Sequence, residues 1–218
     1  MPTLSIAGGA ANMRLPPAGE MERLRAEFAR RHYVRILGFL DARFVAKILP
    51  AVETAVFRVD RYAKSYRGIC RHWGRVLTLL LDEPSLRECV RKISGYQRPI
   101  LSINAVVYRQ TSGKKHRVLW HTDPPTLPGR WAECTLSVNL GGPYQGGELE
   151  MRAPGSKRLA ARIANTKSGD AVLFRHTLVH RGAPVVGPRP KLMIFIWFSL
   201  KPLRRIPGLE PKARKGAA

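Results

Sequence analysis

The most constraining feature of this sequence is its second half, where short apolar and β-branched runs alternate with clusters of Gly, Pro, Ser and Lys from Ile100 onward. Runs of this length, bounded by turn residues, are typical of β-strands. We predict strands near Leu101–Arg109, Arg117–Thr122, Ala132–Leu140, Gly147–Arg152, Leu159–Ala164, Ala171–Arg175, Leu178–Pro184 and Lys191–Leu200. Eight short strands with regular turn signals predict a double-sheet jelly roll or a barrel.

The first half has a different texture. Met21, Leu24 and Phe28 lie on one face of a predicted helix over Glu20–Arg31, and a strand follows over Tyr33–Leu40. We predict a second helix from Asp41 to Val56, kinked or split at Pro50, and a third from Pro84 to Ile93. The expected organisation is one mainly β domain with N-terminal helices: a flexible arm at 1–18, a helical support at 19–97, a β-strand core at 98–200 and a basic tail at 201–218.

The charge balance is unusual. The chain has 38 Lys and Arg residues against 15 Asp and Glu residues, which gives a formal net charge of +23. This excess is spread along the sequence, and residues 201–218 are themselves basic. Two explanations stay open: an anionic partner such as RNA or an acidic small molecule, and the composition of an arginine-rich source.

Several classes of protein are disfavoured. No apolar run approaches the roughly 18 residues of a membrane span, and the start of the chain lacks the pattern of a signal peptide. The 3 cysteines, Cys70, Cys89 and Cys134, are scattered, so neither a disulfide framework nor a structural zinc site is expected. We therefore predict a cytoplasmic protein that makes no contact with a membrane.

Two potential metal ligands lie close together in the sequence. His121 and Asp123 are two residues apart, so on a strand both side chains point to one face. With a distant histidine they would form the facial set of two histidines and one carboxylate that holds non-haem Fe(II). The pair by itself is equally typical of a surface loop in which an aspartate is hydrogen-bonded to a histidine.

The residues that follow favour the metal interpretation. Downstream lie Ser137-Val-Asn139-Leu, Gly146-Gly147-Glu-Leu149, Leu173-Phe174, His180 with Pro184-Val185, and Arg189. In order and spacing, residues 101–200 resemble the Fe(II)/2-oxoglutarate-dependent oxygenases, in particular their prolyl-4-hydroxylase-like branch. The resemblance implies a cupin-like double-stranded β-helix, with a helix–strand–helix support at residues 20–57.

The resemblance also assigns roles to single residues. His121, Asp123 and His180 match the Fe(II) ligands, and Arg189 matches the residue that pairs with the distal carboxylate of 2-oxoglutarate. Lys191 is the alternative anchor because it lies on the same strand face, while Tyr108 and Ser137 match positions that contact the co-substrate. His176 competes with His180 as the third ligand, since residues four apart on a strand point the same way. The interval from His180 to Arg189 favours His180.

The resemblance implies an O2-dependent hydroxylase that releases succinate and CO2, with ascorbate as a candidate reductant. Asp123 argues for hydroxylation, because halogenating relatives have a small residue at this position. The expected substrate is a protein residue or an amino-acid-like small molecule. A nucleic-acid demethylase is disfavoured by Phe195, which stands where those relatives have a second arginine. The residues also leave open a non-catalytic basic binding module and an iron-free isomerase.

Overall fold

A large antiparallel sheet forms the centre of the molecule. The computed structural model describes residues 1–7, 10–55, 58–59, 69–72, 80, 83–112, 118–123, 132–142, 144–164 and 167–200. The order of the seven strands in this sheet is β3-β11-β7-β14-β6-β5-β4. Their bounds are Tyr33–Ile36 (β3), Ala171–Arg175 (β11), Cys134–Asn139 (β7), Lys191–Leu200 (β14), Ile100–Gln110 (β6), Ile69–His72 (β5) and Arg58–Val59 (β4).

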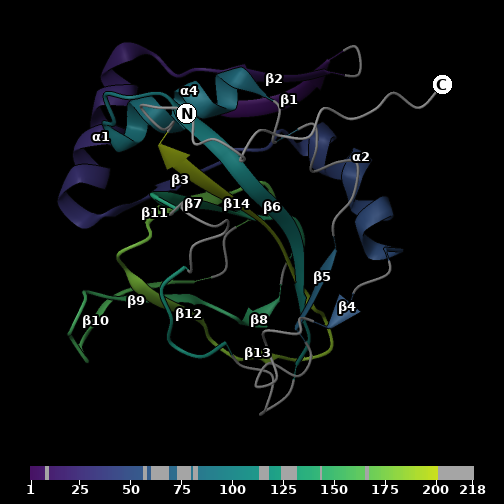
Figure 1. Cartoon of the computed structure of the whole chain (residues 1–218). Coiled ribbons are helices and arrows are strands. Elements are labelled where there is room, and N and C mark those ends of the chain that lie inside the picture. Colours follow the sequence, from purple (N-terminus) through teal and green to yellow (C-terminus); the bar gives the residue numbers. More distant parts are fainter. Residues whose placement is uncertain are drawn as a thin grey trace, which may run out of the picture.

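A smaller three-stranded sheet lies across one face of the large one. Its order is β10-β9-β12, with bounds Leu159–Ile163 (β10), Leu149–Arg152 (β9) and Val179–Gly182 (β12). A short ladder of β8 (Gln145–Gly146) and β13 (Val185–Val186) extends this side. Figure 1 shows these strands on the opposite side of the large sheet from the helices. The predicted jelly roll with N-terminal helices is thereby confirmed.

Side-chain alternation gives the large sheet two different faces. Along β14, Leu192, Ile194, Ile196 and Phe198 belong to the main hydrophobic core, whose other members include helix residues such as Leu24 and Phe28. The intervening side chains point toward the small sheet, because successive residues of a strand face opposite ways. β14 is therefore buried on both faces, which explains why its sequence is an almost continuous apolar run.

Within the described residues, three helices cover the core face. They are α1 (Ala18–Arg31), α2 (Ala42–Glu53) and α4 (Pro84–Ser94). α2 begins where the Asp41 carboxylate accepts a hydrogen bond from the Arg43 amide at 2.8 Å. It continues through Pro50 to Glu53, so the predicted split is wrong. Pro50 removes one backbone bond, to the carbonyl four residues earlier, and only three helical residues follow it.

The prediction of a flexible arm at residues 1–18 is also wrong. Thr3–Ala7 (β1) and Ala10–Arg14 (β2) form an antiparallel hairpin. The Leu4 amide donates to Phe39 O at 2.6 Å, the Asp41 amide donates to Leu4 O at 2.8 Å, and the Leu4 side chain is fully buried. These contacts come from distant residues, which a local reading of a Gly/Ala-rich segment does not detect.

Most predicted strands are present, and one is not. Of the predicted strand Arg117–Thr122, residues 118–122 are described, and within them only His121 makes a β-bridge, to His180. The end of the second predicted helix at Val56, the loop residues 113–115 and the basic tail at 201–218 lie outside the described residues. Among the helices that are described, none has the length and apolar character needed to cross a bilayer.

Candidate metal centre

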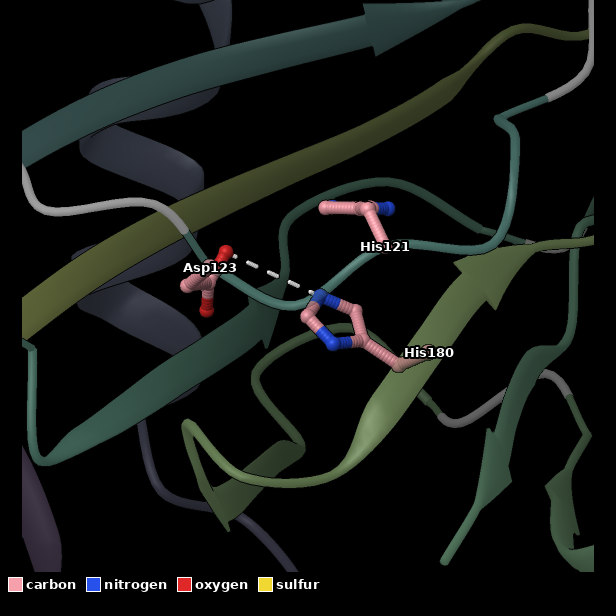
Figure 2. Close-up of side chains that lie close together, drawn as sticks. All are labelled: His121, Asp123 and His180. Atoms are coloured by element: carbon pink, nitrogen blue, oxygen red, sulfur yellow. Dashed lines mark ion pairs between the residues drawn. The ribbon is translucent and has the colours of Figure 1, made fainter. Parts of the chain in front are cut away.

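Three of the predicted ligands converge between the two sheets. The potential ligand atoms of His121, Asp123 and His180 all lie within 4.8 Å of one another. The Nε2 atom of His180 is 3.7 Å from Oδ1 of Asp123, and the two imidazole rings are 4.4 Å apart between centroids. Figure 2 shows the three side chains turned toward one shared space. A metal ion placed there would meet two nitrogens and one oxygen.

The backbone brings these residues together by pairing two distant segments. His180 lies on β12, and the amides of His121 and His180 each donate to the other residue's carbonyl, at 3.0 and 2.8 Å. Asp123 follows two residues later and is 7% exposed. The predicted shared orientation of His121 and Asp123 is therefore present, although the segment that carries them makes only a single bridge instead of a regular strand.

Hydrogen bonds orient each donor atom. The Nδ1 atoms of His121 and His180 lie 2.8 and 3.1 Å from the carbonyls of Leu119 and Leu178, which fixes each Nδ1 as the protonated nitrogen and leaves Nε2 as the ligand atom. Thr135 donates its hydroxyl hydrogen to Oδ2 of Asp123, so Oδ1 stays available. Burial lowers the pKa of His180, with the nearby His121 acting in the same direction and Asp123 opposing it. The ring is thus neutral, as a metal ligand must be.

This donor set fits Fe(II). Two neutral imidazoles and one carboxylate on one side of an ion form the facial triad of non-haem iron enzymes, which leaves positions open for substrates. Phe174 of β11 packs edge-on against His180, with 4.7 Å between ring centroids. The competing His176 is directed elsewhere, since its Nδ1 atom lies 3.1 Å from Glu133 O and it is not among the grouped ligands.

A buried cation, the side chain of Lys191, lies near the strand of the small sheet that carries His180. Lys191, at the start of β14, is 4% exposed, and its Nζ donates to Gly147 O at 2.6 Å. A Cβ atom built on Gly182 would lie 3.8 Å from this Nζ. Gly182 is two residues beyond His180 on β12, which is about 7 Å along a strand and on the same face. Burial lowers the pKa of the Lys191 ammonium to about 8.

Arg189 does not occupy the position that the sequence suggested. It is exposed in the loop before β14, whereas the expected role required a guanidinium buried beside a carboxylate. Ser137 and Tyr108 do lie on the site face: Ser137 is 2% exposed, and the Tyr108 ring packs against Phe195 with 5.4 Å between centroids. The large sheet thus directs Tyr108, Ser137 and Lys191 into the same inter-sheet space.

Sequence reasoning missed Thr135 and Phe174 as neighbours of the ligands. Both could have been found from strand alternation, because Thr135 is two residues before Ser137 on β7 and therefore shares its face. Phe174 lies opposite Thr135 in the ladder between β11 and β7. Arg152 and Arg181, whose guanidinium groups lie over the Trp120 ring, had no such local signal, because they lie on strands far from Trp120 in sequence.

The comparisons with known proteins agree with this geometry. The sequence profile of the 2OG-Fe(II) oxygenase superfamily matches residues 103–199, which contain all three ligands. The matched segment lies within the β-strand core of the chain, so this core is similar to that superfamily, and together with the ligand group the match indicates Fe(II) and 2-oxoglutarate as cofactors. Among curated protein sequences, none matches the chain.

Several solved structures share the fold over nearly the whole chain. An oxidoreductase of the 2OG-Fe(II) oxygenase family from Burkholderia pseudomallei has a TM-score of 0.67 at 14% identity, covering 90% of this chain and 94% of its own. The epimerase SnoN in complex with Fe3+, alpha ketoglutarate and nogalamycin RO has a TM-score of 0.66 at 18% identity, covering 91% and 95%. A prolyl hydroxylase from Trichoplax adhaerens, bound to a peptide fragment of hypoxia inducible factor, has a TM-score of 0.62 at 16% identity, covering 83% and 89%. At these identities the likeness is one of fold.

Proposed function

We propose that the protein is a hydroxylase that inserts oxygen into a C–H bond of a protein residue or an amino-acid-like small molecule. The observation that carries this proposal is the group of His121, Asp123 and His180, with the buried Lys191 beside Gly182, two residues beyond His180 on β12. When bound, iron and 2-oxoglutarate supply, with O2, the oxidising power that turns the C–H bond into C–OH, and succinate and CO2 leave as the other products.

Each residue of the chain has a binding or orienting role in this scheme. The two Nε2 atoms and Oδ1 of Asp123 would hold the ion, and the backbone carbonyls and Thr135 keep these atoms in place. Lys191 pairs with the distal carboxylate of 2-oxoglutarate, because a buried ammonium offsets the desolvation of that anion. Tyr108 and Ser137 border the same space and contact the co-substrate.

The assignment to Lys191 in place of Arg189 rests on burial. A carboxylate taken out of water needs a cation that is itself desolvated, since an ion pair exposed to solvent contributes little. Lys191 meets this condition at 4% exposure. Arg189 lies in an exposed loop two residues earlier. The arrangement leaves the ammonium directed between the sheets, toward the side that carries His180.

The substrate class follows from the prolyl-4-hydroxylase-like motifs of the sequence. Relatives in fold include a prolyl hydroxylase seen with a peptide and an epimerase seen with nogalamycin RO. We favour hydroxylation because Asp123 supplies a carboxylate ligand that occupies one position on the ion. These three groups would hold the ion from one side, and a facial set of this kind leaves positions for a co-substrate and oxygen.

The proposal is tested with purified protein under anaerobic conditions. Fe(II) and 2-oxoglutarate together should give a weak visible charge-transfer band, and with O2 and a substrate pool the protein should release succinate and add one oxygen atom to a product. His180→Ala should abolish both signals. His176→Ala is the matched control and should retain them, because His176 lies outside the ligand group. Metal binding without a band or succinate would refute an oxygenase, and product without added oxygen would refute hydroxylation.

A further inference from the structure

The outer face of the small sheet carries a stacked cluster that no catalytic role accounts for. The guanidinium carbon of Arg152 lies 3.7 Å from the centroid of the Trp120 ring, and that of Arg181 lies 4.5 Å from it. Both distances are within the range of a cation–π interaction. Trp120 is thus held by two arginines, one from β9 and one from β12.

Arg181 is itself fixed by a buried carboxylate. The Glu150 side chain is fully buried, and its Oε2 accepts a hydrogen bond from Nε of Arg181 at 2.6 Å. Its Oε1 accepts one from Nε of Arg162 at 2.9 Å. Burial raises the pKa of Glu150, but the two arginines lower it further than burial raises it, so the carboxylate is ionised. Arg181 therefore has a rigid position from which to support the Trp120 ring.

The cluster lies directly behind the metal ligands in the chain. Trp120 precedes His121, and Arg181 follows His180. The two histidines face each other inside the sheets, while Trp120 and Arg181 meet outside. Within the described part of this region, residues 118–123, backbone pairing to the small sheet consists of the two hydrogen bonds between His121 and His180. The external stack is therefore a further restraint on the segment that carries His121 and Asp123, beside this bridge and the hydrogen bond from Thr135 to Asp123.

We propose that Trp120 is a positioning residue for the metal centre, held by Arg152 and Arg181. The stack prevents residues 118–123 from pivoting about the single β-bridge, and so keeps the ligand atoms of His121 and Asp123 opposite Nε2 of His180. Loss of the stack lowers metal affinity because the ligands must then be ordered when the ion binds. This inference rests on the metal centre described above.

The experiment measures the affinity of metal-free protein for Mn(II) by calorimetry, beside its thermal midpoint without metal. Trp120→Leu should raise the Kd by about 10- to 100-fold, the range for residues that orient metal ligands. Trp120→Phe should bind more tightly than Trp120→Leu, since a phenyl ring still accepts a cation. Arg181→Gln should also raise the Kd. Arg162→Gln is the matched control, because it removes one partner of Glu150 and leaves the stack on Trp120 intact.

The visible absorption of bound Co(II) gives a second readout, since its shape depends on ligand geometry. Trp120→Leu should change this spectrum, whereas Arg162→Gln should not. Unchanged Mn(II) affinity and Co(II) spectrum in Trp120→Leu would overturn the inference. An equal rise in Kd for Arg162→Gln and Arg181→Gln, in proportion to their loss of thermal stability, would also overturn it. Failure of the wild type to bind Mn(II) would instead refute the metal centre itself, and the inference with it.

Discussion

Replacement of Lys191 by Met tests the co-substrate site most directly. Burial of the Lys191 ammonium lowers the stability of the free protein, whereas its charge raises the affinity for the anionic co-substrate, so the substitution should change these two quantities in opposite directions. Burial lowers the pKa of Lys191 from 10.5 to about 8. One pKa unit corresponds to about 1.4 kcal/mol, so keeping this ammonium charged at neutral pH costs the folded protein about 3 kcal/mol. Loss of the hydrogen bond to Gly147 O offsets about half of the gain. In the absence of co-substrate, Lys191→Met should therefore be at least as stable as the wild type in urea at pH 7.

The same substitution should weaken binding of 2-oxoglutarate strongly. Truncation of one partner of a buried charge pair costs about 2–5 kcal/mol, which is about 30- to 4,000-fold in Kd. Arg189→Met is the control, since an exposed ion pair is worth at most about 1 kcal/mol, or about fivefold. Calorimetric titration of the Mn(II)-loaded variants with 2-oxoglutarate measures both. Strong loss in Arg189→Met together with wild-type affinity in Lys191→Met would refute the assignment from burial.

Three further predictions concern other parts of the structure. First, affinity for 2-oxoglutarate should fall as the pH rises through about 8, because Lys191 then loses its proton in the free protein; a flat profile from about pH 7 to pH 10 would contradict this role. Second, Thr135→Val should raise the Kd for Mn(II) by about 10- to 100-fold by freeing the Asp123 carboxylate, while Thr135→Ser should bind normally. Third, Leu4→Ala should lower the free energy of unfolding by about 2–5 kcal/mol in urea; a loss below about 1 kcal/mol would mean that the N-terminal hairpin is not part of the core.

The sequence predicted those elements whose signals are local. The long apolar run of Lys191–Leu200 predicts a strand, and proline at Pro84 predicts a helix start because proline suits a first turn; the structure has both. The strand predicted to Leu40 ends instead at Ile36, since Gly38 turns the chain with a positive φ and its amide donates to the Asp170 side chain. That bond joins residues far apart in sequence, so no local pattern indicates it.

In the candidate site, too, the sequence predicted some residues and left others undecided. The spacing of His121 and Asp123, and the motif around His180, were sufficient to find the three grouped side chains. The choice between Arg189 and Lys191 was not available from spacing, because it depends on where β14 begins. A strand that starts at Lys191 buries that residue and leaves Arg189 in the loop. The start of β14 therefore indicates which basic residue is buried more reliably than the spacing of the motif does.

The link between Thr135 and Asp123 has a mechanical consequence. Thr135 belongs to the large sheet, whereas His180 belongs to the small one. An ion held by Asp123 and His180 would cross-link the large and small sheets of the jelly roll. Any species that binds only the folded state adds to its stability. Removal of the ion should then weaken the contact between the two sheets before it disrupts either sheet. Susceptibility to proteases would rise first along the edge of the small sheet.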